Sequence, residues 1–330
     1  MTALPEAWQM SYPLISAPSA ERTLAEASIS LAELRQLQAA LKGRLCIDEP
    51  MAKHTTFRIG GKADLFLHAD GLDDLRVITA WARERQLPLK MIGNGSNMLV
   101  SDKGIRGLVV KLTSGFKEFH FSPEGLLVGA GTKLAQVVNA SVKEGYTGLE
   151  STVGIPGTMG GALATNAGTD TGSIGDIVIE VTALGENGAT AIYPRSQLVY
   201  RYRWSSLSGG KLVILGARLA LQPSEPVQVK AKIERLLEKR AARQPIHDKS
   251  AGSIFKNPEA IAAGKLLDRA GAKGMQVGDA VVSTKHANFI INRGRATAAE
   301  VRALIEQCHK LVQKTNGIDL EREVEFVGEW

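Results

Sequence analysis

Gly154-Ile-Pro-Gly-Thr-Met-Gly-Gly-Ala162 is the most informative stretch of this 330-residue chain. Four glycines and a proline within eight residues cannot pack a core with their own side chains, but their backbone can lie against a flat or polyanionic ligand. No lysine followed by serine or threonine completes a Walker P-loop, so this kind of ATP site is excluded. We therefore interpret the segment, with Asn166-Ala-Gly168 after it, as a ligand cradle; a bare loop is the alternative.

A second glycine-rich loop, Gly93-Asn-Gly-Ser-Asn97, joins two apolar segments. Successive backbone N–H groups in such a loop form a concave nest that suits phosphate oxygens. The loop is not the Rossmann fingerprint, because no third glycine follows and no helix opens after it. Taken alone it could equally be a tight turn.

Around these loops the pattern alternates between strands and helices. A capping box at Ser30–Glu33 opens a helix that Gly43 is expected to end as a C′ glycine. Pro223 and Pro226 mark the predicted boundary before the last third of the chain. Residues 1–27 have no clear period and are expected to be a loose extension. Helices are predicted at 72–86, 133–143, 227–243 and 260–270, and strands at 63–69, 89–92, 107–112, 117–121, 126–129, 177–184, 211–221 and 324–327.

The composition limits the class of protein. With 44% apolar and 22% charged residues it is ordinary for a globular protein. No apolar run approaches the roughly 18 residues of a membrane helix. The two cysteines are far apart and the first residues lack a basic head, so we expect reduced thiols and a cytoplasmic location. The net charge of +6 comes mostly from the last third, which suits an anionic small molecule.

Several polar segments are less informative by themselves. Ser250–Pro258 can bind an anion through Lys256 and Asn257, or can be an ordinary capped turn. The cations Lys239, Arg240 and Arg243 end a helix, where they complement its dipole. Tyr202–Ser205 and Leu320–Val324 offer an arginine and a carboxylate that are unremarkable on a surface. The six histidines and two cysteines show no metal-ligand spacing, so no metal is expected.

Read together, these segments closely resemble the UDP-N-acetylenolpyruvoylglucosamine reductases (the MurB family), flavoenzymes of peptidoglycan precursor synthesis. The resemblance covers about residues 55–328 and rests on six ordered motifs. It implies an α+β fold: an N-terminal extension with one helix (1–50), a two-lobed FAD-binding domain of the vanillyl-alcohol-oxidase type (51–225, lobes about 51–112 and 113–225) and a C-terminal α+β substrate domain (226–330). The motifs are Thr56–Gly61, Gly93–Asn97, Gly148–Glu150 with Gly154–Gly157, Tyr202–Ser205, Gly252–Pro258 and Leu320–Val324.

The resemblance also implies roles for individual residues. Arg203 and Glu323 would stabilise negative charge on the substrate, and Ser253 would be the general acid. Ser205-Ser206-Leu, and the short distance from Arg243-Gln-Pro245 to Lys256, look like the shorter form of the family, which lacks an inserted substrate-clamping loop. The implied substrate contacts are Tyr202, Lys256, Asn257 and His286. The implied FAD contacts are Arg58, Gly93, Asn94, Gly95, Ser96, Asn97, Gly154, Ile155, Gly157, Thr158, Gly161 and Asn166.

The implied reaction uses noncovalent FAD, NADPH as reductant and UDP-N-acetylglucosamine-enolpyruvate as substrate, in a protein expected to be a monomer. A flavin oxidase of the same fold is the nearest alternative; it would explain the glycine loops but not Ser253, Asn257 and Glu323 together. A basic nucleic-acid-binding protein is the alternative from another class. It is disfavoured because aromatic residues make up only 5% of the chain and do not alternate with basic ones.

Overall fold

The computed structural model describes residues 29–330, so the predicted loose extension (1–27) lies outside the described residues. The first lobe is built on a four-stranded sheet in which β2 pairs in parallel with β5, β5 in parallel with β3, and β1 antiparallel with β2. Its elements are α1 (Leu31–Ala39), β1 (Arg44–Pro50), β2 (Lys62–Ala69), α2 (Leu72–Glu84), β3 (Leu89–Ile92), β4 (Met98–Val100) and β5 (Ile105–Leu112).

The second lobe is a five-stranded antiparallel sheet in the order β12-β11-β15-β7-β6, with helix α4 packed on it and helix α3 packed against β8. Its elements are β6 (Phe119–Ser122), β7 (Gly125–Gly129), α3 (Leu134–Glu144), β8 (Tyr146–Thr147), α4 (Met159–Thr165), β9 (Gly168–Thr169), β10 (Gly172–Ser173), β11 (Val178–Gly185), β12 (Thr190–Pro194), β13 (Tyr200–Arg201), β14 (Trp204–Ser205), β15 (Leu212–Leu219) and β16 (Gln222–Pro223).

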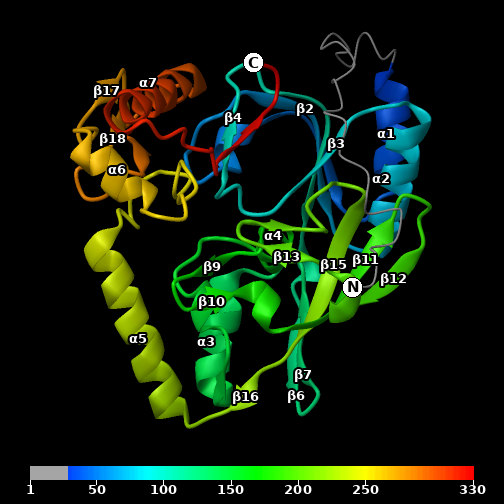
Figure 1. Cartoon of the computed structure of the whole chain (residues 1–330). Helices are drawn as coiled ribbons and strands as arrows, with labels where there is room; N and C mark the ends of the chain where they lie inside the picture. The colour runs from blue at the N-terminus through cyan, green and yellow to red at the C-terminus, as the bar shows by residue number, and fades with distance from the viewer. Residues whose placement is uncertain (1–28) are drawn as a thin grey trace.

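The last third of the chain begins with the long helix α5, which runs from the second lobe to a small α+β unit (Figure 1). Pro226 stands in its first turn, where its missing N–H costs nothing. Val229 and Ile233 of α5 are buried in the core of the second lobe. The elements here are α5 (Pro226–Arg243), α6 (Ala263–Arg269), β17 (Gln276–Val277), β18 (Ala280–Val282), β19 (Ile290–Asn292), α7 (Ala298–Asn316) and β20 (Glu325–Val327).

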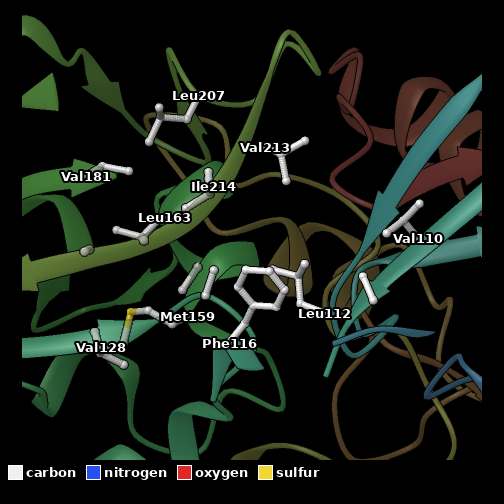
Figure 2. Packing of buried hydrophobic residues seen from close by; sticks show 14 of the residues in the cluster. Val110, Leu112, Phe116, Val128, Met159, Leu163, Val181, Leu207, Val213 and Ile214 are labelled. Carbon is white, nitrogen blue, oxygen red and sulfur yellow. The ribbon is translucent and has the colours of Figure 1, made fainter. Parts of the chain in front are cut away.

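One continuous hydrophobic core joins the two lobes. Leu112 at the end of β5 and Phe116 just after it belong to the same buried cluster as Met159 of α4 and Val181 of β11, and Figure 2 shows part of this packing. A separate core holds the C-terminal unit together, and Phe57 and Leu99 of the first lobe extend into it. The three parts are thus packed against one another.

The last strand returns the chain to its beginning. β20 pairs in parallel with β4 of the first lobe, with Phe326 opposite Leu99, so the red C-terminal segment lies against the cyan strand in Figure 1. This pairing carries the preceding residues, 320–324, to the junction of the first lobe and the C-terminal unit.

Several local predictions need correction. α1 ends at Ala39 with Ala40 as its C-cap, so Gly43 is not the C′ residue; a Cβ on Gly43 would lie 2.0 Å from the His68 carbonyl oxygen, so close approach explains this glycine. The strand expected at 117–121 is present as β6, but it begins at Phe119 and ends at Ser122, after a 3-10 turn at Ser114–Phe116. The helix expected at 260–270 is only Ala263–Arg269.

Candidate active site

A cleft of about 1980 Å³ opens where the two lobes and the C-terminal unit meet. Both glycine-rich loops line it, as does the segment that carries Ser253 and the segment that carries Glu323. The structure therefore brings together motifs that are up to about 230 residues apart in the chain. The predicted site residues that line the cleft are Gly93, Asn94, Gly95, Ser96, Asn97, Ile155, Gly157, Thr158, Gly161, Asn166, Tyr202, Arg203, Ser253, Lys256, Asn257, His286 and Glu323.

The first glycine loop, Gly93–Asn97, connects β3 to β4 and is fixed by its backbone. Gly95 has a φ of 61°, and a Cβ there would lie 2.1 Å from the carbonyl oxygen of His54. Its own carbonyl oxygen accepts a hydrogen bond from the backbone N–H of Thr56 at 3.1 Å. Only glycine combines this conformation with this close approach.

The second glycine loop differs from the expected open cradle, because its latter half is the short helix α4. Thr158 is the N-cap, and its hydroxyl accepts a hydrogen bond from the backbone N–H of Gly161. A Cβ on Gly160 would touch Ala130 at 3.0 Å, whereas one on Gly157 or Gly161 would meet no atom closer than 3.6 Å. Those two glycines leave open space along the cleft wall.

The two glycine loops are also joined to each other. The Asn94 side-chain amide donates a hydrogen bond to the Pro156 carbonyl oxygen at 2.6 Å. The loops therefore form one surface of backbone and small side chains, with room for a flat group beside it. This surface fits the diphosphate and the ring system of a dinucleotide cofactor, because nests of N–H groups bind phosphate oxygens.

Arg203 is held in a strained position in the tight turn between β13 and β14. Its φ of 55° places it in the left-handed region, which is uncommon for a non-glycine residue. Its Nη1 donates a hydrogen bond to the Gly168 carbonyl oxygen at 2.9 Å, and its guanidinium lies over the Tyr202 ring. The guanidinium is therefore oriented by the protein before any ligand binds.

Glu323 is the ionic partner of Arg203. The Glu323 Oε1 lies 2.7 Å from the Arg203 Nε, although the Nε–H is not aligned for a hydrogen bond. The Glu323 side chain is 13% exposed. Burial raises the pKa of this carboxyl, and the charges of Arg203 and Lys256 oppose that rise. The group can therefore hold a proton more readily than an ordinary glutamate.

Backbone hydrogen bonds hold the segment that carries Ser253 against the segment that carries Glu323. It follows Gly252, whose φ is 76°, and precedes Ile254, whose carbonyl oxygen accepts the backbone N–H of Glu323 at 2.8 Å. The amide of the buried Asn288 fixes the next residue, since it both donates to and accepts from the backbone of Phe255. Ser253 is half-buried and lines the cleft, and it directly precedes the residue whose backbone pairs with Glu323.

The neighbouring polar residues are already engaged by the protein. Lys256 makes an ion pair with Glu321. The Asn257 side-chain oxygen accepts the backbone N–H of Ala263, so this residue caps α6, and its own N–H donates to the Tyr202 hydroxyl at 3.3 Å. Both interpretations of Ser250–Pro258, an ordinary capped turn and an anion-binding segment, are thus compatible with the structure.

His286 is a neutral donor that also lines the cleft. Its Nδ1 accepts the backbone N–H of Asn288 at 3.3 Å, and burial lowers its pKa. An accepting Nδ1 leaves the proton of the neutral ring on Nε2.

Two of the predicted FAD contacts lie off the cleft. Arg58 is exposed, and its Nη1 donates to the Lys53 carbonyl oxygen. Gly154 has a φ of 73°, and a Cβ there would lie 2.8 Å from Arg240 Cδ, so it clears space for that side chain.

Comparison with known proteins identifies the family. Residues 244–327 match the family model described as the UDP-N-acetylenolpyruvoylglucosamine reductase C-terminal domain, and residues 63–191 match an FAD binding domain model. The UDP-N-acetylenolpyruvoylglucosamine reductase of Moorella thermoacetica is 43% identical over 294 residues, which cover 89% of this chain and 97% of that protein. The chain belongs to the UDP-N-acetylenolpyruvoylglucosamine reductase family. It is therefore an FAD-dependent oxidoreductase.

Further members of the family agree with this assignment. The reductase of Geobacter metallireducens is also 43% identical, with the same coverage of both chains. The crystal structure of the reductase from Thermus caldophilus superimposes with a TM-score of 0.75 at 33% identity, and the match covers 87% of this chain and 99% of that one. The predicted fold class, a two-lobed α+β FAD-binding domain followed by a C-terminal α+β domain, is confirmed.

The reductase cleft contains cations that the sequence analysis assigned only to a helix dipole. Lys239, Arg240 and Arg243 at the end of α5 all line the cleft. Arg240 is the most buried of them; its Nη1 donates to the Val153 carbonyl oxygen, and its Nε has no partner among residues 29–330. In the sequence, only the excess of positive charge in the last third of the chain indicated that these cations lie at a ligand site.

Two features are absent from residues 29–330 of the reductase. No group of three or more histidine, cysteine, aspartate or glutamate side chains there could hold a metal ion. None of the helices in that part of the chain is both long enough and apolar enough to span a membrane.

Proposed function

We propose that the protein reduces the enolpyruvyl ether of UDP-N-acetylglucosamine-enolpyruvate to UDP-N-acetylmuramate with NADPH, as a step of peptidoglycan precursor synthesis. The observation that supports this best is the Arg203–Glu323 ion pair, in a cleft that Ser253 and the two glycine loops also line. A flavin oxidase needs the loops but has no use for an acid and a cation arranged around a developing carbanion.

The residues of the two loops fit FAD held without a covalent bond. Backbone groups of Gly93–Asn97 would hold the diphosphate. Gly157, Thr158 and Gly161 would flank the ring system, and the two glycines leave open the space that a Cβ would otherwise take up. Bound FAD would supply hydride transfer, from NADPH to C3 of the enolpyruvyl group. We propose residues 51–225 as the cofactor domain and 226–330 as the substrate domain.

Arg203 and Glu323 would stabilise the charge that develops on the substrate. Addition of hydride at C3 leaves carbanion or enol character at C2, next to a carboxylate. A guanidinium that is already oriented stabilises such charge without reorganising. Because burial raises the pKa of Glu323, this carboxyl could share a proton with the enol oxygen rather than repel it.

Ser253 would deliver the proton to C2. A serine hydroxyl is a weak acid, so nearby positive charge must stabilise the alkoxide that remains. Arg203 and Lys256 are the candidates, since Lys256 is close enough to act on Glu323. The proton would return from solvent when the product leaves.

The remaining cleft residues would bind the anionic part of the substrate. Tyr202, Asn257 and His286 present a hydroxyl, an amide and a ring N–H to the cleft. The cations at the end of α5 would face the diphosphate of the substrate's UDP group, because charge-assisted hydrogen bonds favour phosphate oxygens.

A direct test is to incubate the purified holoenzyme with NADPH and the enolpyruvyl substrate without oxygen. The proposal requires one NADPH oxidised per substrate and a product heavier by two hydrogens in mass spectrometry. NADPH oxidation that needs oxygen and leaves the substrate unchanged would instead support the oxidase.

A further inference from the structure

Nine lysines line the cleft, and within residues 29–330 five of them have no carboxylate partner: Lys265 and Lys285 in the C-terminal unit, and Lys111, Lys117 and Lys133 in the two lobes. Lys90, Lys239, Lys256 and Lys273 each pair with an aspartate or glutamate. Within residues 29–330, no carboxylate lies within 4.0 Å of the Lys111, Lys117 or Lys133 ammonium group, and all three lysines line the cleft. Like charges gathered without a counter-ion repel one another, so this grouping needs an explanation.

Lys111 is the informative member because it is partly buried. It lies on β5 directly opposite Ile92 of β3, the residue that precedes the first glycine loop. Paired residues on adjacent strands share a face of the sheet, so the Lys111 side chain emerges beside the start of that loop. Burial and the charges of Lys117 and Lys133 lower its pKa. His68 on the other side of Lys111 brings no negative charge.

Lys133 stands beside the second glycine loop. It forms an isolated bridge with Thr158, and the backbone N–H of the next residue, Leu134, donates to the Gly157 carbonyl oxygen. The lysines therefore flank both loops at the junction of the lobes. Lys117 and Lys133 are exposed, so water alone can solvate their charges. Lys111 is partly buried, so water solvates its charge less well.

We propose that Lys111, Lys117 and Lys133 form a cationic seat for the diphosphate of FAD. The inference rests on the proposed cofactor site and adds to it. The glycine loops offer uncharged N–H donors, whereas a diphosphate brings two negative charges into a partly enclosed cleft. The lysines supply the compensating charge, and Lys111 supplies most of the affinity because it is the least exposed to water.

The test is equilibrium binding of FAD to the protein after its flavin has been removed, followed by flavin fluorescence. Lys111→Met should weaken FAD binding about ten- to hundredfold, and Lys133→Met about threefold. Lys111→Arg should restore most of the affinity. Lys62→Met is the matched control: Lys62 is in the same lobe, exposed, paired with Asp48 and outside the cleft, so it changes the net charge equally and should leave the Kd unchanged.

A second probe, ADP, carries the diphosphate without the flavin ring. It should compete with FAD for the wild-type protein and compete less well for Lys111→Met. Increasing the KCl concentration should weaken FAD binding to the wild type more steeply than to the variant.

The outcomes separate the two proposals. If wild-type protein binds no FAD, the proposed function fails. The cationic seat is wrong if the wild-type protein binds FAD and both Lys111→Met and Lys133→Met bind it with the same Kd. Circular dichroism must show that both variants are folded. An equal loss in Lys62→Met also overturns it. Should Lys111→Met not fold, the exposed Lys133→Met decides.

Discussion

Replacing Glu323 with glutamine should separate stability from activity at the proposed active site. Burial raises the pKa of the Glu323 carboxyl in the folded protein. A group of this kind contributes stability that is complete below its unfolded pKa of about 4.3 and is lost as the pH rises through the raised folded value. Glutamine does not ionise, so the variant avoids this loss. At neutral pH its free energy of unfolding should lie within about 1 kcal/mol of the parent's.

The same substitution should abolish most of the activity. The contact of 2.7 Å between Glu323 and Arg203 disappears as an ion pair, and the carboxyl can no longer share a proton. Loss of one preorganised electrostatic group costs about 10²–10³-fold in turnover, or roughly 2.7–4 kcal/mol of barrier. The assays are NADPH oxidation with the enolpyruvyl substrate and thermal unfolding at several pH values. The stability difference should favour the variant more as the pH rises from about 4 to about 7.

Glu329→Gln provides the matched control, because Glu329 forms ion pairs with Lys103 and Arg106 but does not line the cleft. It should keep its turnover. The reasoning is refuted if Glu323→Gln retains more than about a third of the parental rate, or if its relative stability declines as the pH rises.

Three further predictions concern the cofactor and the chain ends. FAD should be released entirely into the supernatant by acid or heat, since no attachment motif is recognised around Cys46, His54 or His68; yellow colour in the precipitate would contradict this. Gly95→Ala should lose FAD, because its Cβ would lie 2.1 Å from a carbonyl oxygen, whereas Gly188→Ala, with a similar φ of 77° but nothing within 4 Å, should retain it; equal retention would exclude a role for the Gly95 loop. A chain that starts at Ser28 should keep its turnover, and a loss of more than about tenfold would show that residues 1–27 complete the site.

The sequence indicated that the first glycine-rich segment needs glycine, because that need is local. Gly95 needs its residue type for a positive φ and a close approach, and both needs can be read from neighbouring small residues. α4 was missed for the opposite reason. Two glycines in its first turn lower its intrinsic helix propensity, and the helix forms because Thr158 caps it and Gly160 packs against Ala130.

Local sequence patterns could not predict which distant strands pair with each other. Nothing near Leu320–Val324 indicates that β20 will pair with β4, more than 200 residues earlier. That pairing delivers Glu323 to Arg203, and only the family resemblance linked the two residues beforehand. Likewise, Lys239, Arg240 and Arg243 fit a helix dipole equally well whether or not the helix end faces a cleft.

The most direct test of the central claim is stopped-flow absorbance of the two half-reactions in Ser253→Ala. Flavin reduction by NADPH requires no proton at C2 of the substrate, so it should run at nearly the parental rate. Reoxidation by the enolpyruvyl substrate should slow about 10²–10⁴-fold, the usual contribution of a general acid. Equal slowing of both half-reactions, or slowing of neither, would contradict the assignment of Ser253 as the proton donor.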